Sequence, residues 1–166
     1  MPVKPMTSYQ TTISRDWVDY NGHLRDAFYL LIFSYATDAL MDRLGLDSDN
    51  REASGHSLFT LELHLNYLHE VKLDTEVEVH TQLIGHDSKR LHLYHSLHLA
   101  GDDRELAGNE QMLLHVDLAG PRSTPPAAPP ARHAGPAIGH GAGRFKRRLG
   151  RCRAGSGDGD GYLGRG

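Results

Sequence analysis

The sequence contains a single cysteine, Cys152, so no disulfide can form within the chain. It has no apolar N-terminal segment of the secretory type, and no run of about 18 apolar residues that would predict a membrane-spanning helix. Only 7% of the residues are aromatic, and one of them is tryptophan. These absences argue against a disulfide-stapled secreted scaffold and against a membrane protein. They favour a cytoplasmic protein with no membrane partner, and the 166 residues fit one domain.

The charge of the chain is unevenly distributed. Eight Lys and Arg residues and two Asp residues lie in 131–166, which gives +6, so residues 1–130 carry −9 of the total of −3. From residue 127 onward the sequence is rich in Pro, Gly and Arg and has no periodicity, which predicts a disordered tail after a domain at 1–126. The tail is interpreted as a solvated appendage, a nucleic-acid-binding segment or the product of a shifted reading frame. We do not expect nucleic acid to be the main partner.

Hydrophobic periodicity divides the domain into strands and one long helix. Residues 27–44 read as a helix that is apolar around most of its circumference and therefore buried on most sides, with Asp26 as its cap and Gly45 as its stop. After a loop at 46–56 the period changes from four to two. Strands are expected at 7–14, 57–71, 74–85, 90–100 and 105–118. We therefore expect an α+β fold in which an antiparallel meander covers the helix.

A short polar loop precedes the helix and contains the chemistry of interest. In "DWVDYNGHLRD" Asp19 comes three residues before Gly22, which permits a tight turn or a close approach of backbone to ligand. The free N–H groups of the following helix point towards this loop and favour an anion. A carboxylate beside such donors can attack a carbonyl or activate water, although a loop Asp before a helix is more often a cap.

The element order and two motifs together resemble the hotdog-fold acyl-CoA thioesterases of the 4-hydroxybenzoyl-CoA thioesterase type. The motifs are "VDYNGHLRDAFY", with Asp19, Gly22, His23 and Tyr29, and "NYLHEVKLDTEV", with Tyr67 and Asp74. The resemblance covers about residues 7–126. It implies a long central helix wrapped by a curved antiparallel sheet.

The resemblance also implies an activity and a set of site residues. Asp19 would be the catalytic nucleophile or general base, and the backbone N–H groups of Gly22, His23 and Leu24 would bind the oxyanion. CoA would lie across the interface of a homodimer or homotetramer. Its phosphates would meet Arg90, with Lys72 and Lys89 as further possibilities. No cofactor is implied, because the CoA thioester is itself the substrate.

Within that group, the segments 17–47 and 57–71 are most similar to the betainyl-CoA thioesterases of carnitine catabolism. Many relatives carry Asn where this chain has Arg25. A trimethylammonium group donates no N–H hydrogen bonds and is commonly held against aromatic faces. Trp17, Tyr20 and Tyr29 lie near Asp19 in sequence, and we expect them to bind the acyl group. Their alternative role is packing beneath the loop.

Other polar residues lead to weaker expectations. His92, His95 and His98 are three apart on a strand, so they alternate between its faces, and no histidine cluster has metal-ligand spacing; we expect no metal. Thr60 and Glu62 could orient water. A second acid site on the helix, at Ser34, Thr37 and Asp38, is the alternative if Asp19 points away.

Two other functions remain open at this stage. A hotdog hydratase or dehydratase would need a catalytic His paired with an acid, and the nearby Pro of a common form is missing after His23. A non-catalytic domain that binds acyl-CoA or a partner is the third reading.

Overall fold

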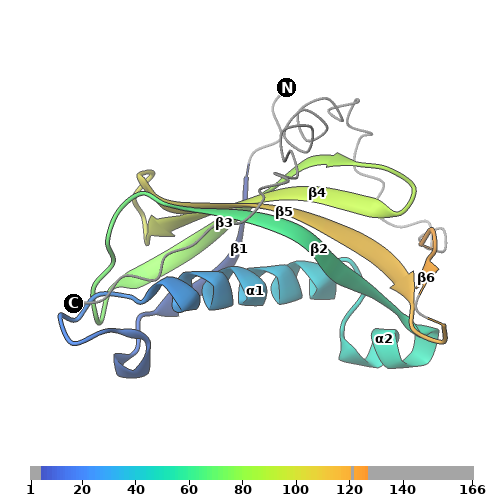
Figure 1. Cartoon of the computed structure of the whole chain (residues 1–166), viewed down its shortest axis with the longest axis horizontal. Coiled ribbons are helices and arrows are strands. Elements are labelled where there is room, and N and C mark those ends of the chain that lie inside the picture. Colours follow the sequence, from blue (N-terminus) through green and yellow to red (C-terminus); the bar gives the residue numbers. More distant parts are fainter. Residues whose placement is uncertain (1–4, 121, 127–166) are drawn as a thin grey trace, which may run out of the picture.

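The computed structural model describes residues 5–120 and 122–126 (Figure 1). A curved antiparallel sheet arches over one long helix, which lies along its concave face. The elements, in chain order, are β1 (Met6–Thr12), the short 3-10 helix η1 (Arg15–Trp17), α1 (Asp26–Arg43), α2 (Ser48–Ser54), β2 (His56–Tyr67), β3 (Glu76–His86), β4 (Arg90–Leu99), β5 (Glu105–Asp117) and β6 (Arg122–Ser123). The expected α+β hotdog architecture is confirmed. The expected tail at 127–166 lies outside the described residues, so this division of the chain stays a prediction.

The strand order is β1-β3-β4-β5-β2, with β6 added at one end of β5, and every pairing is antiparallel. Only β3, β4 and β5 form the expected meander. The expectation that β2 continues into it is wrong, because β2 crosses over to pair with β5 and becomes an edge of the sheet. Eight residues separate β2 from β3, which is enough chain for this crossing.

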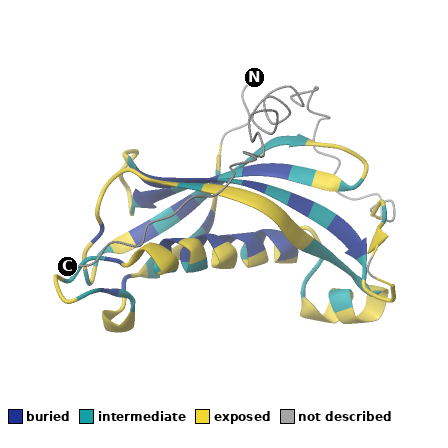
Figure 2. Ribbon diagram, in the orientation of Figure 1, coloured by how far each residue is buried: buried dark blue, intermediate teal, exposed yellow. Residues whose placement is uncertain are grey.

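The core lies between the concave face of the sheet and one side of α1 (Figure 2). Alternate residues of the central strands point inward, and Val77, Val79 and Leu97 are almost fully buried against Ile32 and Phe33 of the helix. Burial of each such side chain contributes about 1.5–3 kcal/mol. This packing fixes the helix against the sheet and therefore fixes the position of the loop that precedes the helix.

The outer side of α1 is not covered, so the expectation of a helix buried on most sides is wrong for the single chain. Leu30 and Tyr35 are 38% and 39% exposed, and Leu44 at the C-terminal end is 53% exposed. The reason is geometric: a single curved sheet contacts only one side of a helix. Apolar residues around the remaining circumference indicate a surface that another molecule can cover.

The ends of α1 differ slightly from the expected ones. Arg25, not Asp26, occupies the N-cap position and makes no side-chain cap; Asp26 is the first helical residue, and its carboxylate accepts the N–H of Ala27 at 2.9 Å. Gly45 follows the helix with φ of 75°, the left-handed conformation expected of a stop residue.

The structure has the short helix α2 where the sequence predicts a loop at 46–56. Asp47 accepts the N–H of Asn50 and so caps the first turn, and Gly55 ends the helix with φ of 69°. With only seven residues and no buried side chain, α2 has too little apolar periodicity to be recognised from its pattern.

A group of polar side chains is buried between α1 and the sheet. The hydroxyl groups of Thr37 and Thr81 lie 3.1 and 2.8 Å from the two ring nitrogens of His95. Gln111 donates to Thr37, and Asn109 donates to Gln111. Burial lowers the pKa of His95 to about 4, so its ring is neutral at neutral pH.

Candidate active site

The loop between η1 and α1 forms a tight turn around Asp19. The N–H of Asp19 donates to the carbonyl of His23 at 2.9 Å, and the N–H of Gly22 donates to the carbonyl of Asp19 at 3.0 Å. Gly22 has φ of 78°, a backbone conformation that residues other than Gly adopt only with strain. The glycine was therefore correctly read as a turn residue.

The turn holds the carboxylate of Asp19 by one of its two oxygens. Oδ1 accepts the backbone N–H groups of Asn21 at 2.8 Å and His23 at 3.0 Å. No hydrogen bond to Oδ2 occurs within the described residues. The bond from the His23 N–H is the main reason that the pKa of Asp19 lies below its ordinary value, and the bond from Asn21 acts in the same direction. Asp19 is therefore ionised at neutral pH, with one oxygen anchored and the other open.

Backbone pairing attaches the loop to the segment between β2 and β3. Leu24 donates to the carbonyl of Val71 at 2.7 Å, and Leu73 donates to the carbonyl of Gly22 at 3.0 Å. The ring of His23 lies 3.5 Å from the carboxylate of Glu70 in the same segment. These contacts position Asp19 against the rigid part of the molecule.

The three N–H groups expected to bind an oxyanion are already engaged. Gly22 donates to the carbonyl of Asp19, His23 to the carboxylate of Asp19 and Leu24 to the carbonyl of Val71. Of the three, only the His23 N–H donates to a side chain. The oxyanion role of this loop stays a prediction.

The aromatic residues expected to bind the acyl group are spread over different environments. Trp17 stacks on Phe28 with ring centroids 6.0 Å apart, whereas Tyr20 is 94% exposed. Tyr29 is 4% exposed, packs edge-on against Tyr67 at 5.1 Å and donates to the carbonyl of His69. The three expected residues therefore differ in their surroundings, and their role in binding the acyl group stays a prediction.

Tyr67 was not assigned a binding role from the sequence, although it lies beside this loop. Its hydroxyl donates to the carbonyl of Asp26 at the first turn of α1, at 3.3 Å, while the residue as a whole remains 53% exposed. Its place at the end of β2, as the tyrosine of the motif "NYLHEVKLDTEV", was the signal in the sequence that could have indicated such a role.

The two adjacent cations proposed for phosphate binding lie far from Asp19 within one chain. Lys89 precedes β4 and Arg90 is its first residue, and the loop with Asp19 lies near the other end of that ten-residue strand, which spans about 30 Å. Arg90 pairs with Asp87 at 2.5 Å, and Lys89 donates to Ser123. The role of Arg90 stays a prediction; Lys72, by contrast, pairs with His23 through a backbone bridge.

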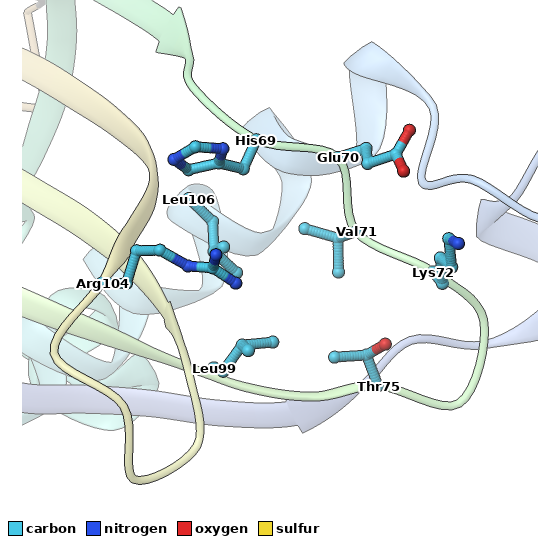
Figure 3. A pocket seen from close by; sticks show the side chains of 8 residues that line it. All are labelled: His69, Glu70, Val71, Lys72, Thr75, Leu99, Arg104 and Leu106. Carbon is cyan, nitrogen blue, oxygen red and sulfur yellow. The ribbon is translucent and has the colours of Figure 1, made fainter.

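A pocket of about 330 Å³ opens beside the loop (Figure 3). It lies between the β2–β3 connection and the start of β5. Its lining residues are His69, Glu70, Val71, Lys72, Thr75, Leu99, Arg104 and Leu106. Arg104 was not singled out in the sequence, where it reads as an ordinary hairpin charge.

The remaining expected residues fall into separate places. Thr37 is buried and bonded to His95, whereas Ser34 and Asp38 are exposed, so the three do not form a second acid site. Thr60 accepts a bond from Gln111, and Glu62 lies exposed on β2. In the part of the chain that the structure describes, no group of three His, Cys, Asp or Glu is placed to hold a metal. Nor does any described helix have the length and apolar character needed to cross a membrane.

A family model described as the thioesterase-like superfamily matches residues 14–135, a segment that contains the whole of the Asp19 loop and strands β2 to β5. The chain belongs to the thioesterase-like superfamily. The family resemblance read from the sequence is thereby confirmed, and so is the expectation of a thioester hydrolase.

Relatives of this thioesterase carry a more specific description. The chain is 69% identical over 120 residues to a betainyl-CoA thioesterase of Pseudomonas aeruginosa, covering 72% of this chain and 76% of the relative. It is 44% identical over 127 residues to an L-carnitine dehydrogenase/betainyl-CoA thioesterase of Agrobacterium fabrum. That match covers 76% of this chain but only 25% of the longer relative.

Solved structures agree with the fold. A crystal structure of a protein from Pseudomonas putida KT2440, described there as a candidate thioesterase, is 66% identical, with a TM-score of 0.65 and coverage of 75% of this chain and 79% of that one. A hypothetical protein from Staphylococcus aureus, solved in complex with CoA, is 31% identical, with a TM-score of 0.70 and coverage of 76% and 79%.

Proposed function

We propose that this thioesterase hydrolyses betainyl-CoA to betaine and free CoA. The observation that carries the proposal is the 69% identity over 120 residues to a betainyl-CoA thioesterase. The chemistry of the loop supports it, because an ionised carboxylate with one open oxygen lies beside the N-terminus of a helix. No cofactor is needed for hydrolysis of a thioester.

Asp19 is the reactive carboxylate in this proposal. Oδ2 either attacks the thioester carbon, expelling CoA as the thiolate and leaving a mixed anhydride that water hydrolyses, or removes a proton from the attacking water. The lowered pKa of Asp19 keeps the ionised form that both routes require. Single turnovers in ¹⁸O-labelled water distinguish them, because only the anhydride route can place the label in the side chain of Asp19.

The oxyanion is bound by a backbone N–H that Asp19 releases. His23 donates to Oδ1 in the resting enzyme, at 3.0 Å. As the carboxylate attacks, its negative charge falls and that hydrogen bond weakens, while charge grows on the thioester oxygen. The N–H of His23 then becomes available to the thioester oxygen, whose negative charge is greatest in the transition state and is stabilised by such donors.

A cationic acyl group suits the surroundings of the loop. Trp17 and the 94% exposed Tyr20 offer aromatic faces to a trimethylammonium group, and Tyr29 supports the loop from the core. The net charge of −9 on residues 1–130 also favours a cation over a neutral acyl group.

The active form is a homodimer that closes the sheet edge at β2. The outer edge of β2 has no strand partner among the described residues, and Phe59, Leu61 and Leu63 on it are 45%, 55% and 38% exposed. A long apolar edge strand is a hazard unless another chain covers it. We place this dimer in the cytoplasm, which suits a domain stabilised without a disulfide.

Release of free CoA from betainyl-CoA, measured with a thiol reagent, tests the function directly. We expect turnover by the wild type and a fall of about 10²–10⁴-fold in kcat for Asp19→Asn. The amide oxygen of Asn can still accept the two backbone bonds, so the melting temperature should change little. Turnover of other acyl-CoAs but not of betainyl-CoA would contradict the proposed substrate. An unchanged kcat in Asp19→Asn would contradict the catalytic role of Asp19.

A further inference from the structure

We propose that the pocket between the β2–β3 connection and β5 binds the phosphate groups of the CoA moiety through Arg104 and Lys72. This inference rests on the proposed function, because it assumes that the substrate is a CoA thioester. It adds a binding site that includes Arg104, a residue in neither of the two family motifs. It also assigns the phosphates to the same chain that supplies the carboxylate.

The charges of this pocket are unusual within the molecule. The described residues include nine Lys and Arg side chains. Five of them are engaged by side-chain hydrogen bonds or an ion pair: Arg25, Arg43, Arg51, Lys89 and Arg90. The other four, Arg15, Lys72, Arg104 and Arg122, have no such partner among the described residues. Two of these four line one pocket in a domain whose overall charge is strongly negative.

The acid in the pocket wall does not neutralise these cations. The carboxylate of Glu70 lies 3.5 Å from the ring of His23, on the side of the Asp19 loop. Figure 3 shows Arg104 and His69 at one side of the pocket and Lys72 at the opposite side, with Glu70 turned away from Arg104. A bound anion would therefore meet two uncompensated positive charges from opposite walls.

The floor of the pocket complements a phosphate attached to a larger organic group. Val71 and Leu106 are 2% and 1% exposed, and Leu99 is half-buried beside them. An apolar floor between two cations suits a nucleotide better than a free, fully hydrated phosphate ion. The volume of about 330 Å³ is large enough for a diphosphate together with part of the organic group that carries it.

The pocket is also placed where the CoA chain can reach it. Val71 accepts the N–H of Leu24 and Lys72 pairs with His23, so one pocket wall is the β2–β3 connection that braces the catalytic loop. A thioester at Asp19 can thus extend its pantetheine arm over this wall. Lys89 and Arg90, by contrast, lie at the other end of β4 in the same chain.

The test compares betainyl-CoA with betainyl-pantetheine, which has the same thioester but no phosphates. For Arg104→Gln, Lys72→Gln and the double variant we expect KM for betainyl-CoA to rise about tenfold per lost contact, with kcat unchanged. Kinetics with betainyl-pantetheine should not change. Arg122→Gln, which removes an equally unpaired charge at the other end of the sheet, is the matched control. Equal effects on both substrates, or none on betainyl-CoA, would overturn the site.

Direct binding measurements separate this site from the proposed reaction. We expect calorimetry to show that free CoA and adenosine 3′,5′-bisphosphate bind the wild type and bind Arg104→Gln about tenfold more weakly. If neither thioester is hydrolysed but CoA binding still depends on Arg104, the hydrolase proposal fails and the pocket stands. If inorganic phosphate or pyrophosphate binds as tightly as the nucleotide, the assignment to CoA is overturned. Unchanged CoA affinity in the double variant overturns the site itself.

Discussion

The imidazole of His95 lies 3.1 Å from the hydroxyl of Thr37, which joins the middle of the sheet to the middle of α1. Both groups are buried, and the ring must stay neutral there because burial lowers its pKa to about 4. This contact gives the fold a dependence on pH that is separate from the chemistry of Asp19.

Stability should therefore fall as the pH is lowered from about 6.5 towards 4. In this window the unfolded chain binds a proton at His95 and the folded chain does not, so protonation favours unfolding. The expected contribution at pH 5 is about 2 kcal/mol. Urea unfolding at pH 7 and pH 5 measures it. His95→Gln should reduce this pH dependence, and a matched His86→Gln on the exposed end of β3 should not; equal pH dependence in His95→Gln and wild type contradicts the assignment.

Gly22→Ala should lower activity more than its effect on stability explains. A left-handed φ at an alanine costs about 1–2 kcal/mol, and relief of that strain would move the turn that anchors Asp19. Gly45→Ala is the matched control, since Gly45 has φ of 75° and, like Gly22, no atom near an added Cβ. Both variants should lose similar stability in denaturant titrations, but only Gly22→Ala should lose kcat. An equal kcat in Gly22→Ala and Gly45→Ala would contradict the proposed dependence of catalysis on the Asp19 turn.

Leu61→Lys should shift the protein towards monomer. Leu61 lies on the open edge strand and is 55% exposed, so a lysine there costs the single chain little but places like charges near each other in a dimer. Light scattering coupled to size-exclusion chromatography measures the mass. Leu118→Lys, a 45% exposed site beyond the end of β5, should leave the mass unchanged. A dimer of unaltered stability in Leu61→Lys would contradict the proposed interface.

Gly108→Ala should destabilise the domain by about 1–3 kcal/mol, because an added methyl group overlaps the Tyr94 hydroxyl and the Glu105 carboxylate. These two groups are hydrogen-bonded to each other, and burial together with Glu105 raises the pKa of Tyr94. Gly85→Ala on β3 meets no atom within 4 Å and should be close to neutral. Thermal unfolding of the pair tests the prediction. Similar melting temperatures would show that Tyr94 can move without loss.

The periodic and local signals of the sequence were sufficient to locate most of the strands and the long helix. Alternation placed β3, β4 and β5 within a few residues of their observed bounds, and Gly45 marked the end of α1. The crossing of β2 to β5 was not predictable in this way, because strand partners depend on contacts across the whole sheet. Likewise, the sequence shows that α1 is apolar around most of its circumference, but it does not show that the sheet of one chain covers only one side of this helix.

The candidate site shows the same difference between features that are local in sequence and contacts that form only in the fold. The position of Asp19 beside a glycine turn is a local property, and the turn is as expected. The N–H groups of Gly22 and His23 are engaged by Asp19 within the turn, whereas that of Leu24 is engaged by Val71, which meets the loop only in the fold. Arg104 could not be identified for a similar reason. The sequence around a charged hairpin residue does not show whether its side chain lines a pocket or is solvated.

The Asp19 loop is fastened to the molecule mainly by its main chain. Val18 pairs with Leu24, His23 pairs with Lys72, and Leu73 donates to Gly22, all through backbone groups that every residue except proline shares. Side chains around the loop can therefore be exchanged during evolution without displacing the reactive carboxylate. Substrate specificity can therefore change independently of the catalytic step. After gene duplication, one copy can come to hydrolyse a different acyl-CoA and still use the same carboxylate.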